Sequence, residues 1–319
     1  MADFTHYPPG PAPEWTQFEK TWKRPKPSPT ATLQEIRETA NATAAAVFAD
    51  VLGRPSELAI VVPYPSLLIS VDQCVLTFHV GEGLNVEDHH VPTTDGVSIA
   101  ARLYKPTNPS PSIGAPLPIY ISFHGGGFHL GSLETEDPHC RQVALKTGIA
   151  VLNVNYRHTP EWTFPSPVHD AWAVYEWAVQ NASKIDIDAE RIYIGGVSAG
   201  ACLSISVALR ALHQDGTPKV QGLILGTPST VHPDVFPLDS LRGKTSSLQI
   251  NANAPFINEA RLRGFIELYK PDPAHPSCSP LLVPTEEFRG LCPVSFHVAG
   301  LDPLRDEGLL FEAKLKDAG

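Results

Sequence analysis

The fold class is decided by the stretch Ile192-Tyr193-Ile194-Gly195-Gly196-Val197-Ser198-Ala199-Gly200. Ile192 to Gly195 is a short apolar run of the kind that forms a buried strand, and a helical pattern runs from Ala199 to Gln214. Between them, Gly196 to Gly200 matches G-x-S-x-G, a sharp strand-to-helix turn in which a Cβ two residues before or after the serine finds no room. The flanking strand and helix favour Ser198 as a nucleophile over an ordinary serine in a glycine-rich turn.

A second glycine-rich turn, His124-Gly125-Gly126-Gly127-Phe128, follows the predicted strand Ile119 to Phe123. Each glycine costs about 1 kcal/mol relative to alanine in a regular element, so three in succession need a reason. Close backbone approach supplies one, because N–H groups in such a turn can face a carbonyl oxygen as it becomes an oxyanion, which is worth about 3 to 4 kcal/mol per donor. We expect His124 to shape this turn through bonds to nearby backbone. A flexible loop is the alternative interpretation of the glycines.

Outside these turns the chain alternates short apolar runs with longer amphipathic ones, which is typical of a mostly parallel sheet covered by helices. Two strands are expected between Glu87 and Tyr104, around the Asp95-Gly96 turn. The other predicted strands are Ile149 to Val154, Leu223 to Leu225 and Val294 to Val298, and the other predicted helices are His139 to Lys146 and Val168 to Asn181. The sequence therefore predicts an α/β fold with a mostly parallel twisted sheet and helices on both faces.

Two segments depart from this alternation, and we expect both to lie over the carboxyl edge of the sheet. Residues 8–29 are rich in proline and indicate an extended arm, after which Thr32 and Glu35 match a capping box for a helix reaching about Asp50. The alternation stops again at about residues 230–270, which indicates a helical cap. We expect an N-terminal arm with cap helices in residues 1–85, and a core in residues 86–319 that carries the cap insertion.

The motifs together resemble the hormone-sensitive-lipase-like branch of the α/β-hydrolases, which pairs H-G-G-G with a later G-x-S-A-G. The likeness covers about residues 87–319, including Asn155-Tyr156-Arg157-His158-Thr159-Pro160-Glu161 and Ser279-Pro280-Leu281. The family implies an eight-stranded sheet, a helical cap, acyl-ester substrates and a Ser-Asp-His triad in that chain order. Val197 departs from the polar residue, usually aspartate, that the family has beside the nucleophile. Matching positions imply Ser198 as the nucleophile and the amides of Gly126, Gly127 and Ala199 as the oxyanion hole, with His124, Gly125, Gly196 and Gly200 completing the motifs.

Asp302 matches the family's acid and lies just past the predicted strand Val294 to Val298, although a helix N-cap before Pro303 is an alternative role. Residues 303–319 read as one helix with Leu309, Leu310, Ala313 and Leu315 inward, and they contain no histidine. The family continues through one more strand to the catalytic histidine, so we expect the last strand and helix of the fold to be absent here. Among the upstream histidines, His232 and His275 remain candidates for the base because they lie in or near the cap.

Three explanations stay open for the missing histidine. The 319 residues are a truncated form of a full enzyme, or a natural variant that binds ligand or performs chemistry without a strong base, or a partner chain supplies what is absent. In each case the strand Val294 to Val298 becomes an exposed edge that can recruit a second copy into a homodimer. The hypothesis is a serine carboxylic-ester hydrolase acting on a small acyl ester. The alternative is a hydrolase-like binding or cyclase-type protein with no efficient hydrolysis.

The composition fits small-molecule chemistry. The net charge is −10 and no block rich in Lys and Arg offsets it, which argues against a nucleic-acid partner. The five cysteines are odd in number and show no metal-ligand spacing, so we expect a reducing compartment and neither metal nor cofactor. No stretch has the pattern of a signal peptide or a membrane span, and we therefore place the protein in the cytoplasm.

Overall fold

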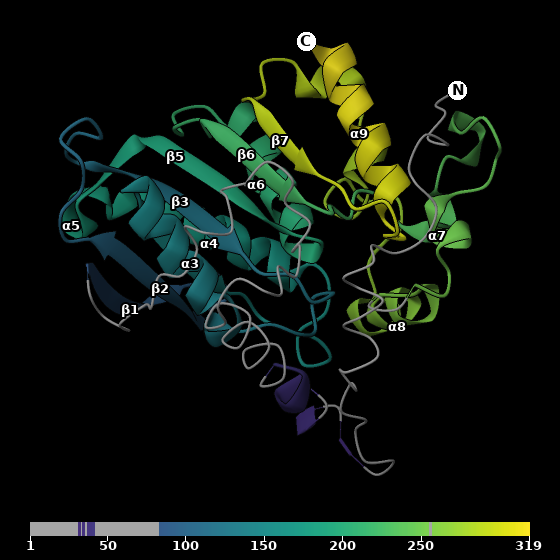
Figure 1. Ribbon diagram of the computed structural model, residues 1–319, viewed down its shortest axis with the longest axis horizontal. Coiled ribbons are helices and arrows are strands. Elements are labelled where there is room, and N and C mark those ends of the chain that lie inside the picture. The colour runs from purple at the N-terminus through teal and green to yellow at the C-terminus, as the bar shows by residue number, and fades with distance from the viewer. Residues whose placement is uncertain (1–30, 33, 36, 42–82, 255–256) are drawn as a thin grey trace, which may run out of the picture.

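The computed structural model describes residues 31–32, 34–35, 37–41, 83–254 and 257–319. These residues form a seven-stranded sheet in the order β1-β2-β4-β3-β5-β6-β7 (Figure 1). The pairs β1–β2 and β2–β4 are antiparallel, and the remaining four pairs are parallel. The strands are β1 Leu84–Pro92, β2 Ser98–Pro106, β3 Leu117–Phe123, β4 Ala150–Asn155, β5 Ile187–Val197, β6 Gly222–Gly226 and β7 Val294–His297. The predicted mostly parallel α/β sheet is confirmed, with β5 longer than expected.

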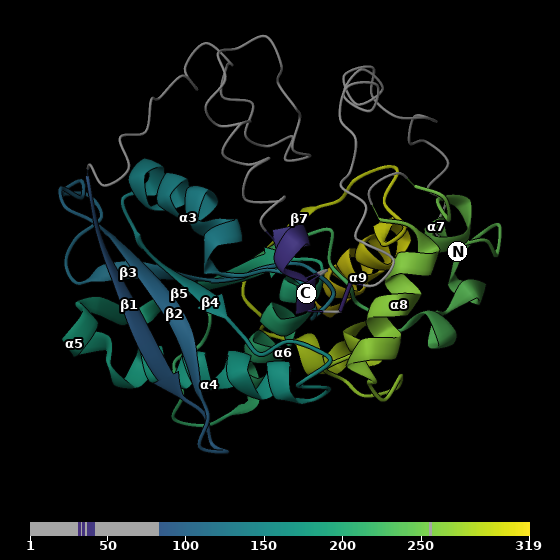
Figure 2. The ribbon, with the colours of Figure 1, turned by 90° about the horizontal axis from the view of Figure 1, so that it is seen from below.

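Helices cover both faces of the sheet, as predicted. Helix α3 lies on one face, and α4 and α6 lie on the other (Figure 2). The larger hydrophobic core contains Val174 of α4 and Leu203 of α6, whereas the smaller core contains Cys140 and Ala144 of α3. The longer helices are α3 Leu133–Thr147, α4 Ser166–Gln180, α6 Ala199–His213 and α9 Arg305–Ala318, and α5 Ala182–Ile185 is a single turn. Both faces of β3 and β4 are therefore buried, which explains their near-continuous apolar sequences.

Local sequence explains where α3 begins and ends. Ser132 accepts a hydrogen bond from the Thr135 amide at 3.4 Å, and the Thr135 hydroxyl accepts one from the Ser132 amide at 3.0 Å, forming a capping box. Gly148 ends the helix with φ 75°, a left-handed conformation that glycine adopts without a Cβ penalty. The helix consequently begins six residues before His139, the predicted start, because this capping box fixes its first turn.

Helix α9 corrects one sequence-based expectation. Phe311 is fully buried and joins the larger core, where its ring meets those of Phe288 at 5.4 Å and Phe296 at 6.2 Å. Ala313 was predicted to face inward but is exposed. The buried stripe of the helix is therefore centred on Phe311, because a helix packs the face that brings its largest apolar side chain to the core.

Residues 230–270 are helical or irregular wherever the structure describes them. Their elements are η3 Pro233–Val235, η4 Leu238–Ser240, α7 Ser247–Ile250 and α8 Glu259–Tyr269, and η5 Pro280–Leu282 and η6 Thr285–Phe288 follow before β7. Helices α7 and α8 lie beside each other at the end of the molecule away from β1 (Figure 2). The division of the chain at residues 85 and 86, with this segment as a cap, stays a prediction.

Few N-terminal residues are described, and the predicted arm at residues 8–29 lies outside them. Residues 34, 35 and 37–41 are helical. The Thr32 amide donates to Glu35 at 2.7 Å, and the Glu35 amide donates to the Thr32 hydroxyl at 3.2 Å, so the predicted capping box is confirmed. The predicted end of this helix near Asp50 also lies outside the described residues.

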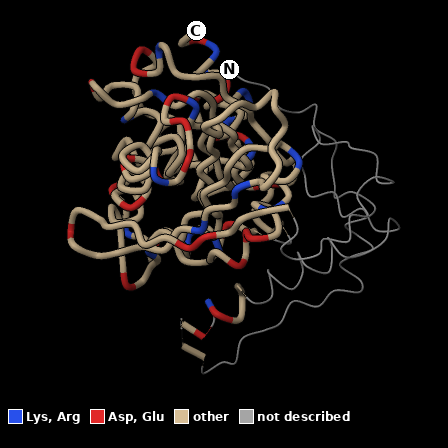
Figure 3. The backbone as a smooth tube through the Cα atoms, turned by 90° about the vertical axis from the view of Figure 1, so that its left-hand side faces the viewer, with Lys and Arg blue, Asp and Glu red and all other residues tan. Residues whose placement is uncertain are grey.

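Acidic and basic residues are interspersed along the described backbone (Figure 3). None of the described helices combines the length and the apolar character needed to cross a membrane.

Candidate active site

Ser198 lies in a strained turn between β5 and α6. Its backbone has φ 55° and ψ −114°, a conformation that non-glycine residues rarely adopt. The Ser198 amide donates to the carbonyl of Gly226 at 2.8 Å, and its own carbonyl accepts from the amides of Cys202 at 3.1 Å and Ser229 at 3.4 Å. The side chain is partly exposed. A serine held this way presents its hydroxyl at the carboxyl end of the sheet and at the N-terminus of a helix.

The glycines on either side of Ser198 allow the chain to pass against β3. A Cβ on Gly196 would lie 2.2 Å from the carbonyl oxygen of Phe123, and a Cβ on Gly200 would lie 2.0 Å from the same atom. Both distances are far inside van der Waals contact, and the atom that would be struck belongs to the backbone. The packing agrees with the reason given from the sequence, that no Cβ fits at these two positions.

The glycine-rich turn after β3 packs directly against the Ser198 turn. A Cβ on Gly125 would lie 3.1 Å from the Val197 carbonyl oxygen. Gly126 and Gly127 have φ 118° and 61°, and a Cβ on Gly127 would lie 2.3 Å from the ring of Phe265 on α8. The turn is closed by the amides of residues 129 and 130, which donate to the Gly126 carbonyl at 3.1 and 2.8 Å. These contacts favour a turn of fixed conformation over the alternative interpretation of a flexible loop.

The structure packs the turn that carries Gly126 and Gly127 against the turn that carries Ser198 and Ala199. Ala199 is the first residue of α6, and a first-turn amide has no partner within its helix. Gly126 and Gly127 lie in the turn that touches the Ser198 turn through Gly125. The arrangement can therefore offer N–H donors, together with the positive end of the α6 dipole, to a negative oxygen beside the Ser198 hydroxyl.

His124 is buried and its ring is bonded on both sides. Nδ1 lies 2.8 Å from the Gly125 carbonyl oxygen, which can only accept, so Nδ1 carries a hydrogen. Burial lowers the pKa of His124 to about 4, so the ring is neutral and Nε2 accepts. The donor to Nε2 is Nε2 of His158 at 3.2 Å. With both nitrogens engaged, His124 has no free position for a proton from Ser198, which is the shaping role expected from the sequence.

The segment after β4 supports this turn. The ring of Tyr156 stacks on His124 with centroids 4.2 Å apart, and its hydroxyl donates to the His124 carbonyl at 2.8 Å. Next to it, Arg157 is bonded to fully buried Asp170 through its amide at 2.8 Å, Nε at 2.9 Å and Nη2 at 2.5 Å. Nη1 of Arg157 meets Asp95 at 2.6 Å. The predicted Asp95-Gly96 turn is thus tied to the segment that holds the glycine turn in place.

The N-terminal helix also reaches the glycine turn. The Asn41 side chain donates to the Gly131 carbonyl at 2.9 Å and accepts from the Gly131 amide at 2.8 Å. A Cβ on Gly131 would lie 2.1 Å from Nδ1 of His124, so the bonded backbone lies against the imidazole. Arg37 bonds the Thr159 carbonyl and forms an ion pair with Glu161 at 2.7 Å. Sequence reasoning missed these contacts, because side chains far apart in the chain give no pattern.

Asp302 is partly buried in the turn between β7 and α9. Its Oδ1 accepts from the Leu304 amide at 2.8 Å, a local bond of the kind proposed for a capping role. Its carbonyl accepts from Asn251 at 3.1 Å and from the Arg305 amide at 3.1 Å. Burial raises the pKa of Asp302 to about 6. The local bond uses one oxygen of the carboxylate, so a cap and a second role for the other oxygen are compatible.

The remaining candidate histidines bond to neighbours in their own segments. His232 accepts at Nδ1 from the Asp234 amide at 3.2 Å, and His275 accepts at Nδ1 from the Ser277 amide at 3.1 Å. His297 lies on β7, as predicted, with Nε2 at 3.1 Å from the Ser295 hydroxyl. These contacts hold His232 and His275 in their own loops and give neither a bond to Ser198.

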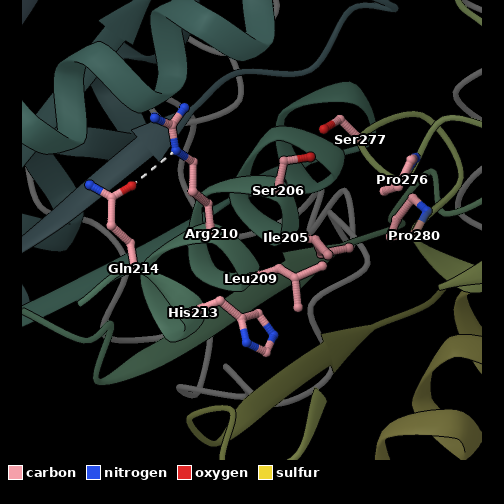
Figure 4. Close-up of a pocket in the computed structure, with 9 residues that line it drawn as sticks. All are labelled: Ile205, Ser206, Leu209, Arg210, His213, Gln214, Pro276, Ser277 and Pro280. Carbon is pink, nitrogen blue, oxygen red and sulfur yellow. Dashed lines mark hydrogen bonds between the residues drawn. The ribbon is translucent and has the colours of Figure 1, made fainter. Parts of the chain in front are cut away.

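A cavity of about 460 Å³ lies along the outer side of α6, between that helix and the loop before η5 (Figure 4). Its lining includes Leu209, Arg210, His213 and Pro280. None of the sequence-predicted site residues lines it, so it is separate from the Ser198 turn.

Comparison with known proteins agrees with this fold. A family model for the alpha/beta hydrolase fold matches residues 120–319. Versiconal hemiacetal acetate esterase of Dothistroma septosporum is 34% identical over 64% of this chain and 62% of its own length, and esterase LipI of Mycobacterium tuberculosis is 34% identical over 69% and 66%. Each match spans under two thirds of the relative. A solved vibralactone cyclase has a TM-score of 0.79 at 28% identity, covering 97% of this chain and 83% of its own. The chain belongs to the α/β hydrolase fold family.

Proposed function

We propose that this chain is the body of a serine carboxylic-ester hydrolase acting on a small acyl ester. The observation that carries the proposal is the strained backbone of Ser198 at the N-terminus of α6, with a glycine turn packed against it. Strain of this kind persists only where the surroundings enforce it, and it is concentrated at reacting groups. The esterases among its relatives support the same reaction class.

In the proposed reaction, the Ser198 hydroxyl attacks the ester carbonyl and the carbonyl oxygen becomes an oxyanion. The amides of Ala199, Gly126 and Gly127 donate hydrogen bonds to that oxyanion, and each donor stabilises the transition state by about 3 to 4 kcal/mol. Collapse of the tetrahedral intermediate breaks the bond to the alcohol, which leaves with the proton that the base took from the Ser198 hydroxyl, and the acyl group stays on Ser198 until water removes it. Phe265 limits the space over Gly127, so α8 restricts the size of the group bound there.

Asp302 takes the role of the triad acid in this proposal. With a pKa of about 6 it is mostly ionised at neutral pH, and it can then orient a histidine and stabilise the imidazolium. The proposal takes that histidine from outside the described residues, whether from the same protein or from a partner chain. Without it, the oxyanion hole and substrate binding would leave an acceleration of about 10³ to 10⁴ over water.

A second candidate is a hydrolase-like binding or cyclase-type protein, in which the amides polarise a carbonyl and no acyl group is transferred to serine. Two observations favour it. First, His124 has no free position for a proton from Ser198, because its Nε2 is bonded to His158. Second, a solved structure similar to this chain bears the name of a cyclase. The two candidates differ in whether Ser198 becomes covalently modified.

A fluorophosphonate probe tests this difference, because it phosphonylates only an activated serine. With the source of that histidine present, we expect labelling of the wild type and of Ser206→Ala, a matched control on the same helix, and no labelling of Ser198→Ala. Hydrolysis of p-nitrophenyl acetate should follow the same order. A wild-type chain that binds an ester but is never labelled would overturn the hydrolase and support the second candidate.

Two finer expectations stay part of this proposal. Strand β7 forms one end of the described sheet, and we propose that it pairs with a second copy in a homodimer. Light scattering that gives a monomer mass at high concentration would contradict this. The second expectation is a cytoplasmic location, which agrees with the free thiols of Cys140, Cys202, Cys278 and Cys292. Cell fractionation tests it.

A further inference from the structure

A buried carboxyl group joins α9 to the loop that follows β6. Glu307 lies in the first turn of α9 and is 5% exposed. Its Oε1 accepts from the amide of Thr230 at 2.7 Å and from the amide of Val231 at 3.4 Å. In the opposite direction, the Thr230 hydroxyl donates to the Glu307 carbonyl at 2.9 Å. Three bonds between the same two segments fix their separation.

The loop bound by Glu307 is the one that touches Ser198. The carbonyl of Gly226 accepts from the Ser198 amide, and the Ser229 amide donates to the Ser198 carbonyl. Between them, Thr227 has φ 36°, which a residue with a Cβ rarely adopts. Thr230 follows Ser229 directly, so a displacement at Thr230 reaches the Ser198 backbone through one peptide unit.

The other end of the connection is the turn that carries Asp302. Helix α7 holds this turn through Ser247, whose amide donates to Asp306 at 2.6 Å and whose hydroxyl donates to the Pro303 carbonyl at 2.7 Å. Asn251 adds a bond to the Asp302 carbonyl at 3.1 Å. The turn is therefore rigid, and moving the first turn of α9 moves Asp302 with it.

We propose that Glu307 is a positioning residue that fixes Asp302 relative to Ser198, an inference that rests on the proposed function. Its carboxyl group binds the backbone beside the nucleophile and belongs to the rigid turn of the acid. A triad works only when its members keep their spacing, and a displacement of about 1 Å costs up to about 100-fold in rate. Glu307 touches neither substrate nor reacting atoms, so its effect is transmitted through Thr230 and α9.

The charge states of the two carboxyls fit this role. Burial raises the pKa of Glu307 to about 8, above the value of about 6 for Asp302. Near pH 7 the acid is mostly ionised while Glu307 is mostly protonated, so two like charges do not oppose each other in the interior. The titratable and charged groups around Glu307 are Asp302, Arg305 and Asp306 on its own turn, Cys202 on α6 and Cys278 in the loop before η5.

The test compares three variants of the whole chain. Glu307→Leu removes the acceptor, Glu307→Gln keeps a carbonyl acceptor at the same place, and Glu312→Leu changes a partly exposed glutamate of the same helix that pairs with Lys316. We measure the rate of fluorophosphonate labelling, kcat and KM for p-nitrophenyl acetate, and amide hydrogen exchange in peptides covering residues 196–202 and 226–231. We expect Glu307→Leu to lower the labelling rate and kcat at least tenfold with KM unchanged, and to speed exchange in both peptides. The labelling rate and kcat of Glu307→Gln should stay within about twofold of the wild-type values, and those of Glu312→Leu should equal the wild-type values.

Each result decides the proposal. A folded Glu307→Leu variant that reacts at the wild-type rate overturns it, as does a Glu307→Gln variant that falls as low as the leucine. If Glu307→Leu does not fold, Thr230→Val removes one of the three bonds, and an unchanged labelling rate overturns the proposal. If the wild-type chain is not labelled, the proposed function fails. Hydrogen exchange then decides alone whether Glu307 fixes the loop at Ser198, with unchanged exchange counting against it.

Discussion

Replacing Asp170 by alanine is expected to lower the free energy of unfolding by about 3 to 5 kcal/mol, because it leaves a buried cation without its counter-ion. Asp170 is fully buried, and the side chain of Arg157 is 5% exposed. The substitution removes the bonds from the Arg157 amide, Nε and Nη2. The remaining partners of Arg157 are Asp95, which pairs with Nη1, and the ring of Trp162, 4.6 Å from the guanidinium carbon. Neither replaces the bonds that Asp170 makes to the amide, Nε and Nη2.

Urea denaturation followed by circular dichroism measures this loss. The matched control is Asp188→Ala, since Asp188 meets Arg191 at 2.7 Å where the two side chains are 28% and 36% exposed. Water replaces the lost partner there, so we expect a cost under about 1 kcal/mol. Labelling of Ser198 in Asp170→Ala should also weaken, because the next residue to Arg157 is Tyr156, which bonds the glycine turn. Equal unfolding free energies for the two variants would refute the reasoning.

Three further predictions follow from single contacts. Gly200→Ala places a Cβ 2.0 Å from the carbonyl oxygen of Phe123, so it should lower the free energy of unfolding by at least about 3 kcal/mol and abolish labelling of Ser198. Its control is Gly264→Ala, where a Cβ meets nothing within 4 Å; this variant should raise the free energy of unfolding by about 0.5 to 1 kcal/mol in urea denaturation. Asn41→Ala loses both bonds to Gly131, just after the glycine turn, and should cost about 1 to 2 kcal/mol by urea denaturation. Glu307 has a pKa of about 8 in the fold against an ordinary 4.5, so its contribution to stability is full below pH 4.5 and is lost as the pH rises to 8. Between pH 5 and 9 the free energy of unfolding should therefore change less with pH in Glu307→Gln than in the wild type, by at most about 5 kcal/mol, as measured by urea denaturation.

The sheet and the Ser198 turn were predictable because local signals are strong there. Strands β3 and β4 are buried on both faces and read as apolar runs, which is why residues 119–123 and 149–154 fall within or beside the observed strands, and residues 223–225 lie within β6. The two glycine-rich turns were recognised because Gly126, Gly196 and Gly200 lie too close to backbone atoms for a Cβ, and backbone contacts do not vary with the partner's side chain. The pattern of glycines therefore carries the geometry directly.

The rest could not be predicted because it depends on pairs distant in sequence. Nothing near Glu307 indicates that its carboxyl binds Thr230, and a glutamate in the first turn of a helix reads as an ordinary favourable charge. A signal was present, since Glu307 lies four residues before buried Phe311 and so shares its face of the helix. The sequence around Asp170 gives no signal of its role either, because its partner Arg157 is thirteen residues away and outside its helix.

The register of the parallel strands explains why these distant contacts meet at one place. Phe123 pairs with Gly196, Val197 with Gly226, and Gly226 with His297, so β3, β5, β6 and β7 end in one row. The segments that follow them are the glycine turn, the Ser198 turn, the loop bound by Glu307 and the turn of Asp302. Ligands enter open α/β sheets at this edge because its loops can change without disturbing the buried strands. Fixing the loops relative to one another then requires side chains such as Glu307, and the site is as rigid as those bonds make it.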